Sequence, residues 1–184
     1  MRAALVTRLD GPSAVEVTDI PATAAADGQV LVDVRAVGIS FPDLLLSKGE
    51  YQVKPDLPFP LGVDFAGVVR EAPEGSGFGS GDRVACVLPY GGAMETVAVH
   101  PEGVFPLPEA LTFEQGAAIP MNYLTAHFAL AKRAGLREGE TVLVHGGAGG
   151  VGTATIQVAK GYGARTIAVV STAEIGRASC RERV

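Results

Sequence analysis

The sequence predicts an α/β plus β fold, in which a small β-rich domain is followed by one strand–helix–strand unit. Two observations predict it. Residues 1–118 contain short apolar runs, most of them bounded by Gly or Pro, as in short strands joined by turns. Residues 141–170 contain two apolar runs that flank a helical pattern, with a glycine-rich string where the helix begins. We therefore expect one domain over residues 1–118 and the start of a second over residues 119–173.

Composition excludes several classes of protein. Of the 184 residues, 47% are apolar, which is enough for a packed core, and the formal net charge of −5 offers no basic surface for nucleic acid. No apolar run approaches the roughly 20 residues of a membrane span, and the first residues lack the apolar core of a signal peptide. Cys86 and Cys180 are too few for a disulfide framework. The sequence predicts a cytoplasmic protein that binds neither nucleic acid nor membrane.

Six strands are expected in the first domain, and together they predict a small β-barrel or sandwich. They cover residues 2–7, 15–18, 30–37, 64–69, 83–88 and 95–99. In the third strand Val30, Val32 and Val34 fall on one face, and Leu31, Asp33 and Arg35 fall on the other. This partial alternation is typical of antiparallel strands with one solvated face.

One short helix is expected at residues 40–47. Ser40 is its N-cap, Pro42 lies in its first turn and Gly49 follows its end.

A change of period at Thr112 marks the passage to the second domain. Thr112 and Gln115 have the spacing of a capping box, and residues 121–133 carry apolar side chains at helical spacing before Gly135. The apolar positions in this helix are Leu124, Phe128 and Ala131.

The second domain begins with a βαβ unit formed by a strand at residues 141–145, a helix at 150–161 and a strand at 165–170. The handedness rule makes the strands parallel. The helix residues expected to lie on the sheet are Val151, Ala154, Thr155, Val158 and Ala159. A single unit cannot bury both faces of a parallel sheet, so we expect the chain to be the front part of a longer protein.

The glycine string between the first strand and the helix predicts a dinucleotide site. It has the form G-x-G-x-x-G, in which Gly147 permits a tight turn, Gly149 lets backbone N–H groups approach a pyrophosphate, and Gly152 lets the helix pack closely. The helix N terminus then faces the phosphates. A glycine string alone is more often only a loop, but the strands around this one favour nucleotide binding. The candidate contacts are Gly147, Ala148, Gly149, Gly150, Val151 and Gly152.

The last residues, 174–184, fit neither a helix face nor a strand. Their string back-translates, codon by codon, into the start of a common sequencing adapter. We therefore expect a non-native tail, which includes Cys180; the alternative is an ordinary basic C terminus.

Six strings, in order along the chain, resemble the zinc-free medium-chain dehydrogenase/reductase superfamily, and most closely its NADPH:quinone oxidoreductase branch. They are residues 37–43, 49–51, 60–69, 81–84, 121–130 and 145–160. The resemblance implies a GroES-like N-terminal domain, a Rossmann-type cofactor domain, a catalytic cleft between them and frequent homodimers. It also implies further Rossmann strands and a return segment beyond the chain in hand.

The resemblance also bears on metal binding. Relatives with catalytic zinc have Cys at the position of Ser40 and a His-Glu pair at Val63 and Asp64. A serine hydroxyl is a poor zinc ligand and valine is none, so we expect no metal. The three histidines, His100, His127 and His145, are expected on the surface or in packing roles.

NADPH is the expected cofactor. No acidic residue stands at the end of the second strand, where one would bind the ribose 2′-hydroxyl of NAD, and hydroxyl residues including Ser171 stand there instead. The resemblance places Ser40 and Asp43 near the nicotinamide ribose and Thr125 against the cofactor.

The expected reaction is hydride transfer from NADPH to a quinone or a related α,β-unsaturated carbonyl. Ser40 and Tyr51 are the candidate catalytic residues; Tyr51 could hydrogen-bond the acceptor carbonyl, and an interfacial packing role is equally open. Tyr123 is a weaker candidate, and in the family that the chain resembles, most close relatives carry Asn where this chain has Ser40. An enoyl-thioester or alkenal reductase, or a non-catalytic nucleotide-binding protein, remains an alternative. We expect residues 1–184 alone to have little activity and to aggregate.

Overall fold

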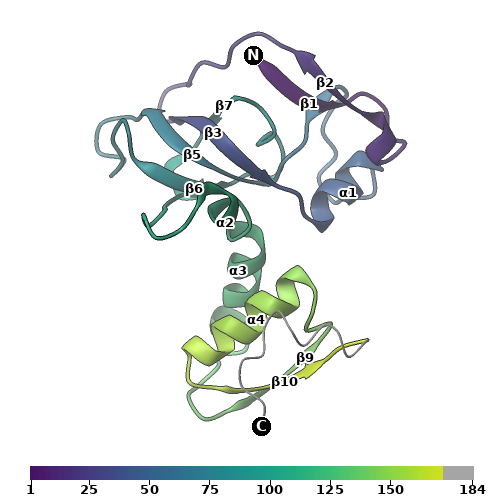
Figure 1. The fold of residues 1–184 in the computed structure, drawn as a ribbon, viewed down its shortest axis with the longest axis vertical. Coiled ribbons are helices and arrows are strands. Elements are labelled where there is room, and N and C mark those ends of the chain that lie inside the picture. Colours follow the sequence, from purple (N-terminus) through teal and green to yellow (C-terminus); the bar gives the residue numbers. More distant parts are fainter. Residues whose placement is uncertain (172–184) are drawn as a thin grey trace. The chain divides into compact units, whose positions relative to one another are not determined.

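The computed structural model describes residues 1–171, and the expected non-native tail at 174–184 lies outside them. The chain divides into two compact units, the first from Met1 to Pro120 and the second from Met121 onward. Each unit is described by itself (Figure 1). In residues 1–171 no helix combines the length and the apolar character needed to cross a membrane.

The first unit is built on a five-stranded antiparallel sheet in the order β7-β3-β5-β6-β8. A smaller antiparallel sheet has the order β2-β1-β4. The strands are β1 (Arg2–Val6), β2 (Val15–Asp19), β3 (Val30–Gly38), β4 (Phe59–Pro60), β5 (Asp64–Glu71), β6 (Arg83–Val87), β7 (Thr96–Val99) and β8 (Val104–Pro106). Two short 3₁₀ helices, η1 (Pro12–Ala14) and η2 (Pro101–Gly103), lie between strands.

The six expected strands are confirmed, and β4 and β8 are additional. Both additional strands are very short, contain a proline and lie at a sheet edge. An edge tolerates the missing N–H of proline, and it is also where sequence patterns predict strands least well.

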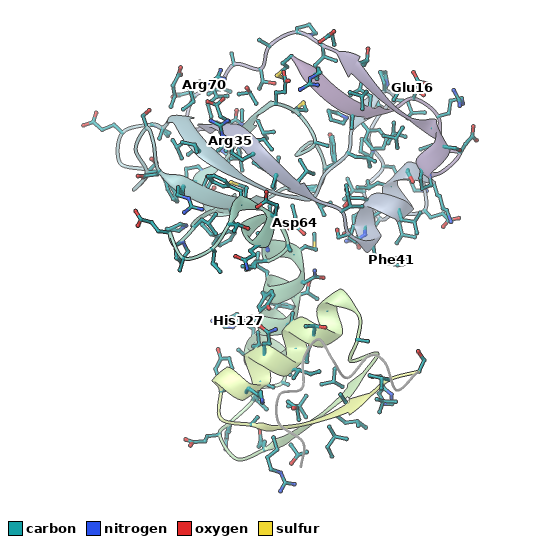
Figure 2. The ribbon with its side chains drawn as sticks, in the orientation of Figure 1. Glu16, Arg35, Phe41, Asp64, Arg70 and His127 are labelled. Atoms are coloured by element: carbon teal, nitrogen blue, oxygen red, sulfur yellow. The ribbon has the colours of Figure 1, made fainter. Side chains whose placement is uncertain are left out.

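The core of this unit lies on one face of the large sheet. It consists of Val30, Val32, Phe65, Val69, Val84, Cys86, Val97, Val99 and Val104. Leu31 was expected on a solvated face, which is wrong, because its side chain is only 4% exposed. The sheet is covered on both faces where β3 begins, and the alternation becomes visible only toward Arg35, which is exposed (Figure 2).

Two helices accompany the sheet, α1 (Phe41–Ser47) and α2 (Phe113–Ala117). The expected capping box of α2 is confirmed. The Thr112 hydroxyl accepts a hydrogen bond from the Gln115 N–H at 3.2 Å, and the Gln115 side-chain oxygen accepts one from the Thr112 N–H at 2.9 Å. The buried Ala117 and Gly116 of α2 face Ala66 and Leu107, so α2 closes this end of the sheet.

In the second unit, α3 (Pro120–His127) continues into the π-helical segment η3 (Phe128–Arg133). The expected stop at Gly135 is confirmed by its φ of +63°. Pro120, Ala126 and Leu130 are buried, whereas Leu124 and Phe128 are exposed. The buried stripe therefore runs beside the apolar positions expected from the sequence.

The βαβ unit is confirmed. It consists of β9 (Thr141–His145), α4 (Gly150–Gly161) and β10 (Arg165–Val169), with the two strands parallel (Figure 1). One sheet face is covered by α4, which buries Val144, and the opposite face leaves Leu143 and Ile167 more than half exposed. A single unit thus leaves one face of its sheet bare within the described chain.

The buried face of α4 differs from the expected one. Ala154 and Ala159 are buried as expected, but the exposed fraction of Val151 is 43% and Ile156 is buried in its place. The buried stripe passes through Gly152, Ile156 and Ala159, which follow the helical spacing i, i+4, i+7. One residue corresponds to about 100° of rotation, so Val151 points well to the side.

Candidate functional site

The turn between β9 and α4 is formed by glycines with different requirements. Its left-handed residue is Gly146, with φ +66°, so the expected assignment of the tight turn to Gly147 is wrong. Gly147 is required for packing instead, because a Cβ atom there would lie 2.8 Å from the Cβ of Ala168 in β10. A Cβ atom on Gly152 would overlap the Gly146 carbonyl oxygen, which agrees with the expected close packing of the helix.

Gly149 differs from these glycines because the packing of the protein does not require it. Its φ of −74° and ψ of 170° are open to any residue, and it is the N-cap of α4. A Cβ atom there would meet only the Gly146 oxygen, at an ordinary 3.5 Å. Apart from its chain neighbours, a side chain at this position would meet no other atom of residues 1–171 within 4 Å of its Cβ, so the space beside the first residue of the helix is open. Absence of that side chain gives a ligand close access to the backbone.

The N terminus of α4 has no side-chain cap. Ala148, Gly150 and Val151 are exposed around it. Uncapped N–H groups at the start of a helix, next to a glycine without steric need, fit a phosphate group. The residues present therefore fit the pyrophosphate of a dinucleotide.

Thr125, an expected cofactor contact, and Tyr123, a weaker catalytic candidate, both lie on α3, and their side chains are engaged differently. The Thr125 hydroxyl donates to the Met121 carbonyl at 2.7 Å and remains exposed, with its oxygen free to accept. The Tyr123 hydroxyl donates to Gln157 of α4 at 2.6 Å, so it joins the two helices. Asn122 was not predicted; its amide lies about 3 Å from the Cβ position of Gly150, beside the N terminus of α4. No local pattern marks it, because the two residues are far apart in sequence.

Ser171 lies just beyond the end of β10 and is exposed. It is the last described residue, and Val170 before it is also exposed. No carboxylate lies between the end of β10 and Ser171.

In the first unit, Ser40 and Asp43 form the N terminus of α1. The expected N-cap role of Ser40 is confirmed. The Asp43 side chain is buried, and one of its oxygens, Oδ2, accepts hydrogen bonds from the Ser40 N–H at 2.9 Å and the Ser40 hydroxyl at 3.1 Å. The other oxygen, Oδ1, accepts one from the Gly62 N–H at 2.9 Å. Both carboxylate oxygens are therefore used inside the protein, whereas Ser40 itself is half-buried.

Tyr51 follows α1 in the loop that begins at Gly49, where φ is +68°. Its side chain is half-buried, and within residues 1–171 no hydrogen bond engages its hydroxyl. Beside Ser40, the aromatic ring of Phe41 is exposed at the start of α1 (Figure 2).

No group of three or more His, Cys, Asp or Glu side chains is placed to hold a metal ion within the described part of the chain. Val63 and Asp64, the two positions that the resemblance relates to zinc ligands, are both buried. His127 stacks loosely on Tyr162, with the ring centroids 6.1 Å apart. His100 is the residue before η2, without a side-chain capping hydrogen bond, and His145 ends β9.

The chain is similar to known proteins in sequence and in fold. Residues 26–109 match the family model of the alcohol dehydrogenase GroES-like domain. The quinone oxidoreductase of Rattus norvegicus is 38% identical over 177 residues, which cover 95% of this chain and 54% of the rat protein. The chain is therefore similar to quinone oxidoreductases in sequence and contains a GroES-like domain of the alcohol dehydrogenase type. Its expected GroES-like N-terminal domain is confirmed.

Two solved structures are similar to this chain in fold. A probable oxidoreductase from Mycobacterium abscessus has a TM-score of 0.88 and 49% identity, and the match covers 95% of this chain and 56% of that one. The quinone oxidoreductase from Thermus thermophilus, solved also in complex with NADPH, has a TM-score of 0.83 and 40% identity, over 95% of this chain and 55% of that one. The chain thus spans about half the length of the relatives it matches.

Proposed function

We propose that the protein is an NADPH-dependent, metal-free oxidoreductase that reduces quinones or related α,β-unsaturated carbonyl compounds. The observation that carries the proposal is Gly149. It is a glycine that neither backbone conformation nor packing requires, at the uncapped N terminus of α4. Similarity to quinone oxidoreductases supports the reaction, and the NADPH complex of the Thermus thermophilus relative supports the cofactor.

The second unit binds the cofactor in this proposal. The N–H groups at the start of α4 receive the pyrophosphate, and Gly147, Ala148, Gly149, Gly150, Val151 and Gly152 line it. Thr125, as an acceptor, and Ser171 add polar contacts. The hydroxyl of Ser171, in the absence of a carboxylate there, suits the 2′-phosphate of NADPH better than the 2′-hydroxyl of NADH.

The first unit serves the nicotinamide and the acceptor substrate. Ser40 contacts the nicotinamide half of the cofactor, and Asp43 supports Ser40. Tyr51 has a hydroxyl that no described residue engages, on a half-buried side chain, and this hydroxyl can donate to a carbonyl oxygen and stabilise the charge that develops on it. Bound NADPH supplies the hydride, and the protein supplies alignment and exclusion of water.

A metal-free mechanism follows from the donor set. A serine hydroxyl at position 40 and an apolar side chain at position 63 leave only Asp64 of the three positions with a group that commonly binds zinc. We also propose a homodimer for the complete protein, as the family resemblance implies.

Turnover with a panel of acceptors tests the proposal. NADPH consumption, followed by its absorbance, is expected with quinones such as phenanthrenequinone, at rates that a chelator does not change, and with NADPH preferred over NADH. Chelator-sensitive oxidation of alcohols with NAD would contradict it. Faster turnover of a 2-enoyl thioester or a 2-alkenal than of any quinone would identify those compounds as the substrate class. Tight NADPH binding without turnover would indicate a non-catalytic role.

A further inference from the structure

We propose that Asp27 is a modification site, at which the Asp27–Gly28 peptide isomerises spontaneously through a cyclic succinimide to isoaspartate. The site lies in the link between β2 and β3 (Figure 1) and is independent of the proposed function. The sequence contains two Asp-Gly pairs, Asp10–Gly11 and Asp27–Gly28. The structure separates them, because the first pair is held in place and the second is open.

The isomerisation is an attack of the peptide on its own side chain. The backbone nitrogen of the glycine forms a bond to the side-chain carboxyl carbon of the aspartate, and one carboxyl oxygen leaves as water. Water then opens the five-membered ring at one of its two carbonyl groups, which gives either aspartate again or isoaspartate. Glycine hinders the closure of the ring least, because it has no Cβ atom. A glycine N–H group and a carboxyl group without other partners favour the attack.

The Asp27–Gly28 pair meets these conditions. The two residues are the central positions of a turn that is closed by a hydrogen bond from the Gln29 N–H to the Ala26 carbonyl at 3.1 Å. Both residues are exposed, and within residues 1–171 no hydrogen bond or ion pair engages the Asp27 carboxylate or the Gly28 N–H. Apart from its chain neighbours, no described residue has an atom within 4 Å of the Gly28 Cβ position. The peptide group between the two residues therefore has room to rotate for the attack.

The Asp10–Gly11 pair has the same chemistry and a different environment. Gly11 is buried, its N–H donates to the Ser47 carbonyl at 3.0 Å, and the Lys48 side chain lies 3.7 Å from its Cβ position. The Asp10 carboxylate accepts a hydrogen bond from the Arg8 Nε at 3.1 Å. The glycine nitrogen must first lose its hydrogen bond, which slows the attack by about tenfold. This pair is therefore an internal control.

The isomerised turn should leave the sheet intact. Isoaspartate adds one carbon atom to the backbone and leaves a free α-carboxylate beside it. The added atom disturbs the turn, including the hydrogen bond from the Ala26 N–H to the Gln29 side chain at 3.0 Å. The strand ladder begins only at the buried Val30, which is the register partner of Val99 in β7. We expect modified chains to remain folded and to accumulate, and their free α-carboxylate suits an isoaspartate methyltransferase.

The test is an incubation of the 184-residue chain at neutral pH and physiological temperature, with circular dichroism to follow the folded state. Peptide mapping measures isoaspartate at each pair, and methyl transfer from S-adenosylmethionine by an isoaspartate methyltransferase gives an independent total. In the folded protein Asp27 is expected to isomerise at least about ten times faster than Asp10. In denaturant the two rates should approach each other. Equal rates in the folded protein, or a faster reaction at Asp10, would overturn the proposal.

Two variants separate the causes. Asp27→Glu keeps the charge but requires a six-membered ring, so methyl transfer to the incubated protein should fall almost to the level that Asp10 contributes. Arg8→Ala removes the hydrogen-bond donor of the Asp10 carboxylate and leaves the Gly11 N–H bonded to Ser47, so Asp10 should stay slow. If Asp10 in Arg8→Ala reacts as fast as Asp27, protection by the bound N–H group is refuted.

Chromatographic separation of the isomerised chains from the unmodified ones tests whether the change is confined to the turn. The two forms are expected to have the same melting temperature, because the hydrogen bonds of β3 start beyond the turn. A clearly lower melting temperature of the isomerised form would refute this confinement.

Discussion

The carbonyl oxygen of Gly146 occupies the place that a Cβ atom on Gly152 would need. The first turn of α4 therefore rests directly on the backbone of the preceding turn. Backbone atoms cannot move aside as the end of a flexible side chain can, so any larger residue must displace the helix or the turn.

We therefore expect Gly152→Ala to lower the free energy of unfolding by about 1–3 kcal/mol and to weaken NADPH binding. Thermal melts and titration calorimetry measure the two effects. Gly161→Ala is the control in the same helix, because no atom lies within 4 Å of its Cβ position. It should be neutral or stabilising by up to about 1 kcal/mol. An unchanged melt for Gly152→Ala would contradict this account of the turn.

Gly149→Ala separates binding from stability. The backbone conformation and the free space at Gly149 accept a methyl group, so the melting temperature should stay close to that of the parent protein. The methyl group projects to where the pyrophosphate is proposed to lie, and we expect the affinity for 2′-phospho-ADP-ribose to fall at least about tenfold, or about 1.4 kcal/mol.

Gly146→Ala is the counterpart, because its φ of +66° strains an alanine by about 1–2 kcal/mol. It should lower the melting temperature. If Gly149→Ala binds 2′-phospho-ADP-ribose as tightly as the unsubstituted protein does, the pyrophosphate lies elsewhere.

Cys86 should be inert in the folded protein. Burial raises the pKa of its thiol from 9.0 to about 12, and only the thiolate reacts readily. In a Cys180→Ser background, a disulfide reagent at a pH below 9.0 should label Cys86 in denaturant and leave it unmodified in the native state.

The same pKa shift predicts a pH dependence of stability. Because folding raises this pKa, the neutral thiol contributes fully below 9.0, and its contribution declines as the pH rises toward 12. Cys86→Ala should remove this part of the alkaline decline. In the labelling experiment, rapid reaction of Cys86 with the disulfide reagent in the native state would show that the core around Cys86 opens.

The bare face of the β9–β10 sheet should cause self-association of residues 1–184. Leu143 and Ile167 are register partners on neighbouring strands, and both are exposed. Replacing them together, as Leu143→Glu with Ile167→Lys, is expected to raise the concentration at which light scattering first detects aggregates. Val144→Glu is the contrast on the covered face, where a buried charge should unfold the unit. Aggregation that the double variant does not reduce would place the associating surface elsewhere.

Local patterns were sufficient for most elements of the fold. The six long strands, α1, α2 and the βαβ unit follow from apolar periodicity, caps and glycine stops, all of which act within a few residues. The capping box at Thr112 is an example, because both of its hydrogen bonds join residues three positions apart.

Features that depend on distant partners were not predictable. The buried face of α4 shifted toward Ile156 because the sheet beneath it sets the rotation of the helix. The main partner of Asp43 outside its own helix is Gly62, 19 residues away, and no pattern in the sequence connects them. Gly146 was missed because G-x-G-x-x-G describes spacing and does not show which glycine takes the left-handed conformation.

The glycine turn has a further consequence for the speed and strength of the proposed binding of a pyrophosphate. The Gly147 N–H donates to the Val169 carbonyl at 3.0 Å, and the Gly149 N–H donates to the Gly146 carbonyl at 2.9 Å. These bonds tie the turn to the neighbouring strand and to itself without a ligand. The conformational entropy of the turn is therefore lost when the protein folds and not when the phosphate arrives. Because the turn is already ordered, a pyrophosphate that meets it can bind with little rearrangement of the backbone.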